Sequence, residues 1–129
     1  FDMKLVFPYV QKATNFYPAV DIKLFGRKDT LTVKALIDSG ASFSVFRPEI
    51  AEQMGVEIER GKRLYLEGIG GRILGYLHKV PVMVGNKKFK CRIVFSREFT
   101  VSFNLLGRDN FFSKFLITFD ENNKEVILE

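Results

Sequence analysis

Apolar residues along this chain recur mostly at every second position, which is the period of half-buried β-strands. The alternation is clearest over residues 31–37, and it stops abruptly at Asp38-Ser39-Gly40. Residues 64–84 form a long hairpin pattern whose turn is Gly68-Ile69-Gly70-Gly71. Similar runs predict further strands over residues 17–25, 87–95, 116–119 and 125–128. The chain is therefore predicted to be mostly β.

Two segments depart from this period and predict short helices. The first begins at Pro48, which suits a first helical turn, and ends at Gly55, which suits a helix C-terminus. The second covers residues 108–115. A chain of 129 residues is long enough for one domain and short for two. We expect a single mostly β domain over residues 1–129 with two short helices.

An apolar pair that leads into a glycine turn and then into a predicted helix occurs twice. Leu36-Ile37 precedes Asp38-Ser39-Gly40, and Leu105-Leu106 precedes Gly107-Arg108-Asp109. This repetition is consistent with a two-fold plan within the chain.

Composition narrows the class of protein. Hydrophobic residues make up 47% and charged residues 27%, which suits a folded rather than a disordered chain. No apolar run approaches the roughly 20 residues of a transmembrane helix, so we expect a soluble protein without a membrane partner. The sequence starts at Phe1 and shows no signal-peptide pattern, which suggests a trimmed chain.

The chain has one cysteine, Cys91, and one histidine, His78. They allow no intrachain disulfide and no zinc cluster, so we expect neither a metal nor a cofactor. The scarcity of cysteine is compatible with a reducing compartment and favours the cytoplasm. His78 shares strand parity with Tyr76 and Val80, which favours a packed histidine over a catalytic base. Cys91 lies among apolar residues of the same parity and is expected to be a buried thiol.

The charge balance is basic, with 20 Lys and Arg against 15 Asp and Glu and a net charge of +5. Such a chain could attract nucleic acid, with its Phe and Tyr residues stacking on bases. The positive residues are scattered rather than blocked, however, and no basic and aromatic motif is present. We therefore expect a solvated basic surface and no nucleic-acid partner.

Asp38-Ser39-Gly40-Ala41 is the most informative site. An ionisable side chain ends an apolar strand there, and a buried carboxylate is costly unless it is paired or hydrogen-bonded. Asp38 could simply accept backbone N–H bonds in an Asx-turn. Alternatively, the carboxylate could have a chemical function.

Three segments carry a family resemblance. They are residues 35–42 with the sequence Ala-Leu-Ile-Asp-Ser-Gly-Ala-Ser, the glycine turn 68–71, and residues 104–109 with the sequence Asn-Leu-Leu-Gly-Arg-Asp. Together, and in this order, they resemble the retropepsin-like aspartic proteases from about Tyr17 to the C-terminus. The resemblance looks closest to small prokaryotic members, in which Gly-Arg-Asp-x-Phe-Phe precedes the last hairpin. It implies the acid protease fold, with a single lobe and a glycine-tipped flap.

The resemblance also implies a reaction and an assembly. Peptide hydrolysis without a metal or covalent intermediate uses one carboxylate to activate water and a second to donate a proton. Two carboxyls about 3 Å apart share one proton, because both cannot ionise cheaply. The chain has one Asp-Ser-Gly string, so the resemblance implies a homodimer with Asp38 catalytic in each copy and a peptide or protein substrate.

Supporting roles follow from the same resemblance. Ser39 would hydrogen-bond across the dimer axis, and the small residues Gly40 and Ala41 would let a substrate backbone approach. The flap that closes over the substrate would comprise Gly68, Ile69, Gly70 and Gly71. The catalytic turn would be supported from behind by Leu105, Leu106, Gly107 and Arg108, with Asp109 capping the next turn.

Two features leave parts of the picture open. Viral relatives carry acidic residues shortly after the catalytic string, where this chain has Ser42 and Phe43, so subsite preference does not carry over. Residues 1–12 match nothing specific, which leaves the outer sheet of the dimer undetermined. The main alternative function is a retropepsin-like dimer with little or no activity that binds extended peptides.

Overall fold

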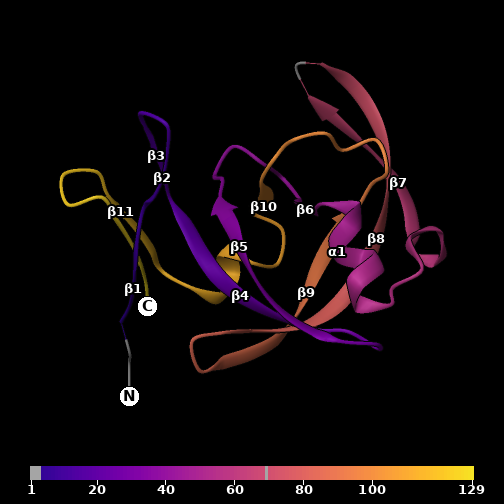
Figure 1. The fold of residues 1–129 in the computed structure, drawn as a ribbon, viewed down its shortest axis with the longest axis horizontal. Coiled ribbons are helices and arrows are strands. Elements are labelled where there is room, and N and C mark those ends of the chain that lie inside the picture. The colour runs from indigo at the N-terminus through magenta and orange to yellow at the C-terminus, as the bar shows by residue number, and fades with distance from the viewer. Residues whose placement is uncertain (1–3, 69) are drawn as a thin grey trace.

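The computed structural model describes residues 4–68 and 70–129 and is built around a seven-stranded sheet in the order β4-β5-β10-β6-β9-β8-β7 (Figure 1). β4 also pairs with β8, so the sheet closes on itself around the core. Its strands are β4 (Ala19–Phe25), β5 (Thr30–Ile37), β6 (Ser44–Phe46), β7 (Lys62–Gly68), β8 (Gly71–Val84), β9 (Lys87–Phe95) and β10 (Asn104–Leu106). The predicted mostly β architecture is confirmed.

Both ends of the described chain meet in a second, three-stranded sheet. Its order is β1-β12-β11, with β1 (Leu5–Pro8), β12 (Glu125–Leu128) and β11 (Ile117–Asp120). β2 (Val10–Lys12) and β3 (Asn15–Tyr17) form a separate hairpin beside it (Figure 1). The N-terminal strand β1, for which no pairing was predicted, is thus paired within the same chain.

The predicted strand over residues 17–25 is divided in two. Tyr17 ends β3 and Ala19 begins β4, because Pro18 has no N–H to donate to a strand ladder. The Pro18 carbonyl oxygen instead accepts the N–H of Ile37 at 2.8 Å. This bond attaches the base of the β2–β3 hairpin to the strand that leads to Asp38.

The first predicted helix is present and the second is not. α1 (Pro48–Met54) ends at Gly55, whose φ of 77° suits glycine and whose N–H bonds the α1 carbonyls. The segment 108–115 is instead a turn followed by the 3-10 helix η2 (Phe112–Lys114), because Asn110, with φ 68°, interrupts any helical run. A second 3-10 turn, η1 (Ile58–Arg60), follows α1.

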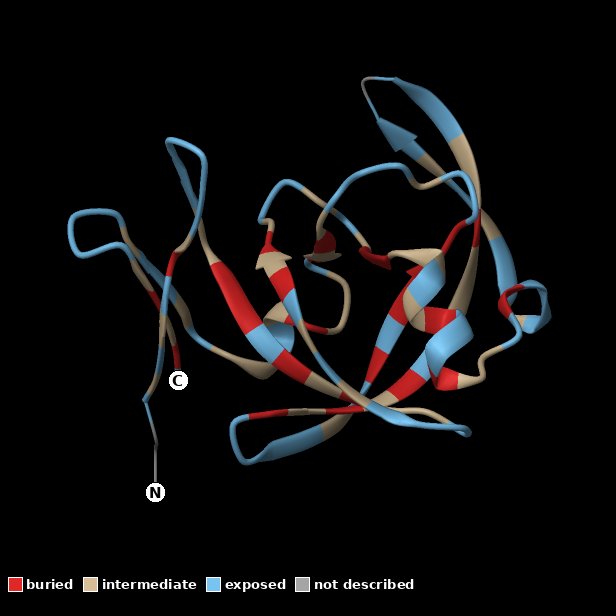
Figure 2. Ribbon diagram, in the orientation of Figure 1, coloured by how far each residue is buried: buried red, intermediate tan, exposed pale blue. Residues whose placement is uncertain are grey.

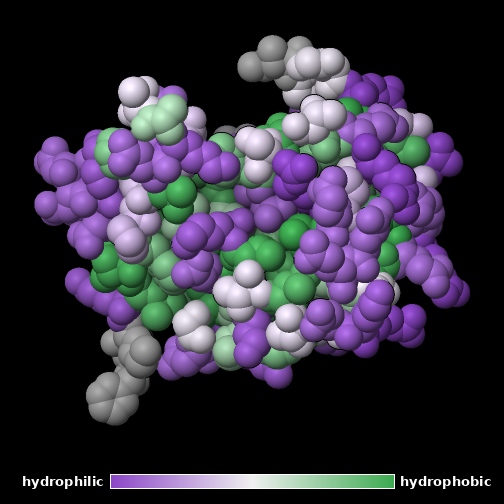
Figure 3. Space-filling model, viewed as in Figure 1, coloured by the Kyte–Doolittle hydropathy of each residue, from purple (hydrophilic) through white to green (hydrophobic). Residues whose placement is uncertain are grey.

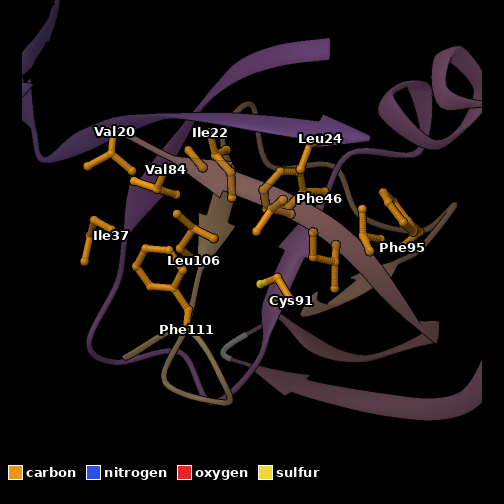
Figure 4. Packing of buried hydrophobic residues seen from close by; sticks show 14 of the residues in the cluster. Val20, Ile22, Leu24, Ile37, Phe46, Val84, Cys91, Phe95, Leu106 and Phe111 are labelled. Carbon is orange, nitrogen blue, oxygen red and sulfur yellow. The ribbon is translucent and has the colours of Figure 1, made fainter. Parts of the chain in front are cut away.

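The core lies inside the closed sheet and beneath α1 (Figures 2 and 4). Burying a large apolar side chain contributes about 1.5–3 kcal/mol, so this cluster dominates the stability of the fold. The largest fully buried side chains include Phe46, Phe95, Phe111, Ile22, Leu24 and Met54. Strands on both sides of Asp38 therefore rest on packed apolar residues.

Candidate active site

The loop that carries Asp38 (residues 38–43, the Asp38 loop) starts where two parallel strands end side by side. β5 and β10 pair in parallel, with Ile37 opposite Leu106. The backbone N–H of Asp38 then donates to the Leu106 carbonyl oxygen at 2.9 Å. Two segments almost 70 residues apart are thereby joined directly at the candidate catalytic residue.

The Asp38 carboxylate is half-buried and held on one side. Its Oδ1 accepts the backbone N–H of Gly40 at 2.9 Å, and the Ala41 N–H donates to the Asp38 carbonyl oxygen at 3.1 Å. These bonds form the Asx-turn that the sequence allowed. Oδ2 accepts no hydrogen bond from the part of the chain that the structure describes. The turn is therefore compatible with chemistry, because it orients the carboxylate and leaves one oxygen open.

Gly107 lies pressed against the Asp38 loop. Its N–H donates to Ser44 Oγ at 3.1 Å, and both residues are buried. A Cβ at Gly107 would overlap the Phe43 carbonyl group and would lie 2.8 Å from the Ala41 carbonyl oxygen. The position requires glycine because two backbones approach too closely for any side chain.

The next two residues continue this contact. The Arg108 N–H donates to the Ala41 carbonyl oxygen at 2.9 Å, and the Asp109 N–H donates to the Ser42 carbonyl oxygen at 2.8 Å. The exposed Arg108 side chain returns to the loop, where Nη2 donates to Ser42 Oγ at 3.2 Å. Backbone and side-chain bonds together fasten the far side of the Asp38 loop.

Asp109 does not cap the following turn, so that prediction is wrong. Its carboxylate instead accepts two hydrogen bonds from Arg92, from Nε at 3.0 Å and from Nη2 at 2.6 Å. These bonds raise the pKa of the Arg92 guanidinium. Sequence reasoning missed this partner because Arg92 lies on β9, 17 residues away. The pairing makes Asp109 a poor rival to Asp38 for chemistry.

Two buried polar residues support the site, although the sequence pattern assigned no role to either of them. Ser44 is fully buried and satisfies the Gly107 N–H. Asn104 is also buried; its Oδ1 accepts the Arg47 N–H at 2.9 Å, and its Nδ2 donates to the Lys34 carbonyl oxygen at 3.2 Å. The only sequence signal for these two supporting residues was a polar side chain within an apolar run, because a buried polar group needs a hydrogen-bond partner.

The remaining residues of the Asp38 loop face outward. Ser39 and Gly40 are exposed and Ala41 is half-buried. Ser39 has no hydrogen-bond partner within residues 4–68 and 70–129 of one chain. Its contact across a dimer axis stays a prediction.

The predicted flap segment lies at the end of the β7–β8 hairpin, which extends from the body at the upper right of Figure 1. Gly68 pairs with Gly71, and a Cβ placed on Gly68, Gly70 or Gly71 would meet nothing within 4 Å. Gly71 has a positive φ of 112°, which suits glycine. Ile69 lies outside the described residues.

Neither the lone histidine nor the lone cysteine belongs to the Asp38 loop. His78 Nε2 bonds the Ile58 carbonyl oxygen at 2.8 Å, and Cys91 is buried among the core residues of Figure 4. Burial raises the pKa of the Cys91 thiol to about 12, which leaves it a poor nucleophile. Across the described ranges, no three His, Cys, Asp or Glu residues gather as metal ligands.

Asp38 is half-buried in the single chain. A cavity of about 480 Å³ lies elsewhere, between the ends of β4 and α1 and the middle of β8, and no residue of the Asp38 loop lines it. Hydrophilic side chains are spread over much of the face in Figure 3 rather than gathered in one block. None of the helices within the described ranges is long and apolar enough to cross a membrane.

Comparison with known families identifies the class of this fold and site. The model of a family described as aspartyl protease matches residues 20–109, which include the Asp38 loop and residues 104–109. The chain therefore belongs to the retropepsin-like aspartic protease family.

Curated relatives match over shorter stretches. The DNA damage-inducible protein 1 of Neurospora crassa is 36% identical over 75 residues, which cover 56% of this chain and 16% of that protein. The protein of the same name from Cryptococcus neoformans is 39% identical over 62 residues, covering 46% of this chain and 14% of that protein. The chain thus matches only a small part of these relatives.

Two solved structures share the fold. A retropepsin-like aspartic protease from Rickettsia conorii superposes with a TM-score of 0.75 and 17% identity, over 99% of this chain and 100% of that one. The EIAV protease, solved with the inhibitor HBY-793, gives a TM-score of 0.58 and 20% identity, over 78% of this chain and 89% of that one. Both likenesses confirm the retropepsin-like fold.

Proposed function

We propose that this chain is an aspartic endopeptidase that acts as a homodimer, with one Asp38 from each copy. Family membership supports a peptidase. The observation that carries the assignment to Asp38 is the geometry of its loop: one carboxylate oxygen is fixed by the Gly40 N–H while the other stays open. A carboxylate oriented in this way can accept a proton from a bound water.

The proposal of a homodimer rests on the supply of carboxylates. Residues 39–47 contain no Asp or Glu, and Asp109 is held by Arg92. One chain therefore offers a single oriented carboxylate at this site, whereas the reaction needs a base and an acid. A second copy related by a two-fold axis would supply the partner from the same position.

In such a dimer the two Asp38 carboxyls share one proton, because close carboxylates repel each other. The ionised carboxylate takes a proton from water, which attacks the peptide carbonyl carbon. The protonated carboxyl donates to the carbonyl oxygen, and the resulting intermediate collapses with release of the amine. We expect a bell-shaped rate profile on the acid side of neutrality.

The neighbouring residues have supporting roles in this proposal. Ser39 bonds its counterpart in the second copy, and Gly40 and Ala41 let the substrate backbone lie close to the loop. Leu106, Gly107 and Arg108 support the loop from behind through the bonds described above. Residues 68–71 close over the peptide and exclude water.

The test is cleavage of a mixed peptide library by the purified chain and by Asp38→Asn. The amide cannot act as base, so kcat/KM should fall by more than about 10⁴-fold with the fold intact. Asp109→Asn is the matched control and should retain cleavage. Undiminished cleavage by Asp38→Asn would contradict the proposal, and a dimer that binds peptides but never cuts them would favour the binding alternative.

Mixing tests the shared site. Diluting wild-type chains into an about ninefold excess of Asp38→Asn chains should lower activity per wild-type chain about tenfold, because most wild-type chains then pair with a mutant. Activity per chain that ignores both the mutant and dilution would show that one chain is sufficient.

A further inference from the structure

The β7–β8 hairpin leaves the support of β9 partway along β8. β8 pairs with β9 from Tyr76 onward, whereas residues 71–75 pair only with β7 among the described strands. β9 ends at Phe95, and the loop that follows it passes the base of the hairpin (Figure 1). We call the first three residues of this loop, 96–98, the hairpin clamp.

Two side chains of the hairpin clamp hold β8 at Leu74. Ser96 Oγ donates to the Leu74 carbonyl oxygen at 2.5 Å, and Glu98 Oε1 accepts the Leu74 N–H at 3.3 Å. Both backbone polar groups of Leu74 are therefore bound by side chains. In the described parts of the chain, residues 71–73 form backbone pairs only with β7. Leu74 is thus the last position of β8 that is anchored to the body before the hairpin tip.

Ser96 is the stronger of these two contacts. Its side chain is fully buried, and its Oγ also accepts the Glu98 N–H at 3.1 Å. Glu98 is exposed, and its bond to Leu74 is longer. Because a hydrogen bond made by a buried group is more costly to lose than one that water can replace, Ser96 should contribute more than Glu98 to holding β8.

The residue between them contacts the other strand of the hairpin at its base. The Arg97 guanidinium bonds both carboxylate oxygens of Glu59, at 2.7 and 3.3 Å, and Glu52 Oε1 at 3.3 Å. Glu59 belongs to η1, which leads into β7. These ion pairs join exposed side chains, so they stabilise the base of β7 only slightly. The buried hydroxyl of Ser96 is therefore the main contact of the hairpin clamp.

We propose that Ser96, assisted by Glu98, fixes the point at which the β7–β8 hairpin bends when it closes over a peptide. This inference rests on the proposed function and adds two positioning residues to it. The bend lies at Leu74 and at Tyr65, its partner on β7, because the contacts with the body end there. Ser96 and Glu98 act through the hairpin and take no part in the proton transfers.

Amide hydrogen exchange tests the position of the bend in the chain without a substrate. In the wild type, the amides of residues 71–73 should exchange faster than those of residues 76–84. In Ser96→Ala the fast region should extend to residues 74 and 75, with their exchange about tenfold faster. Ser44→Ala is the matched control, because Ser44 is also fully buried and its Oγ also accepts a backbone N–H. It should leave the exchange of the hairpin amides unchanged.

Substitutions at the two exposed positions test which contact matters. Glu98→Gln retains a carbonyl oxygen that can accept the Leu74 N–H, so it should behave like the wild type. Glu98→Ala removes this acceptor and should speed exchange at Leu74 by about 2- to 10-fold. Arg97→Gln should change exchange in the hairpin by less than about threefold, because its ion pairs are exposed. A larger effect of Arg97→Gln than of Ser96→Ala would overturn the assignment to Ser96.

Peptide cleavage separates this inference from the proposed function. Ser96→Ala should lower kcat/KM by about 10- to 100-fold and change kcat and KM together, because a misplaced bend misplaces the closed hairpin. Faster exchange at residues 74 and 75 in Ser96→Ala, when the wild type cleaves no peptide, would support the bend and defeat the peptidase proposal. A wild type that cleaves, together with unchanged exchange or unchanged kcat and KM in Ser96→Ala, would overturn the inference and leave the peptidase standing.

Discussion

Glycines at the Asp38 loop and at the tip of the β7–β8 hairpin have opposite surroundings. Gly107 has no room for a Cβ, because the Phe43 carbonyl group already fills that space. Gly68, Gly70 and Gly71 have nothing within 4 Å of a Cβ. The same residue type serves close backbone packing in one region and backbone freedom in the other, so the two regions should respond differently to the same substitution.

Gly107→Ala should give the largest effect on stability. A methyl group there forces β10 and the Asp38 loop apart, and overpacking costs about 1–3 kcal/mol or more. We expect the upper end, about 3 kcal/mol, because backbone rather than a flexible side chain is displaced. Urea unfolding measures the loss, with Gly70→Ala as the control that should change stability by less than about 0.5 kcal/mol. Equal effects of the two substitutions would remove the distinction between the regions.

Ser44→Ala should have the next largest effect. It removes the acceptor for the buried Gly107 N–H, and an unsatisfied buried donor costs about 1–3 kcal/mol. Ser42→Ala removes an exposed hydroxyl from the same loop and should cost little. Urea unfolding of both variants tests whether burial decides the outcome; similar losses would show that the Ser44 bond has no special weight.

The stability that the core contributes should depend on pH, because the Cys91 thiol is buried there. The hairpin tip should show no such dependence. The Cys91 pKa rises from 9.0 to about 12 on folding, because burial disfavours the thiolate. Above pH 9 the unfolded chain loses this proton and the folded chain keeps it, so stability falls by about 1.4 kcal/mol for each pH unit up to about pH 12. Below pH 9 the contribution is fully present.

The measurement is urea unfolding at pH 8 and at about pH 10, with Cys91→Ala as the control. The control has a lower starting stability because it loses buried volume, but it should show a correspondingly smaller decline with pH. Parallel declines in the two proteins would assign the alkaline loss to other groups.

The parts of this structure that the sequence predicted are those with local signals. Pro48 and Gly55 bound α1 where expected, and the glycines at 68–71 mark the hairpin turn. The second helix failed because Asn110 adopts a left-handed conformation that its residue type permits but does not require.

The parts that the sequence missed depend on distant partners. The role of Asp109 depends on Arg92, which the fold brings beside it. The role of β1 depends on β12, which pairs with it from the other end of the chain. The repeated apolar pairs show the opposite case. Leu36 and Leu105 lie opposite each other in parallel strands, so a weak repetition in the sequence corresponds to a direct pairing in space.

Gly71→Val should have the smallest effect on stability and a clear effect on activity. Valine is strained at a φ of 112°, so the turn should shift to relieve the strain. Nothing packs on the tip, so this local change should cost about 1 kcal/mol or less and move the melting temperature by only a few degrees. If the hairpin must close over the peptide, kcat/KM should fall about tenfold or more.

Gly70→Val is the matched control, because Gly70 has no positive φ and its valine should disturb the turn less. Peptide cleavage and thermal unfolding of both variants give the result. Unchanged turnover in Gly71→Val would make the hairpin a connector rather than a flap, whereas a large loss of stability would show that the tip is packed as tightly as Gly107.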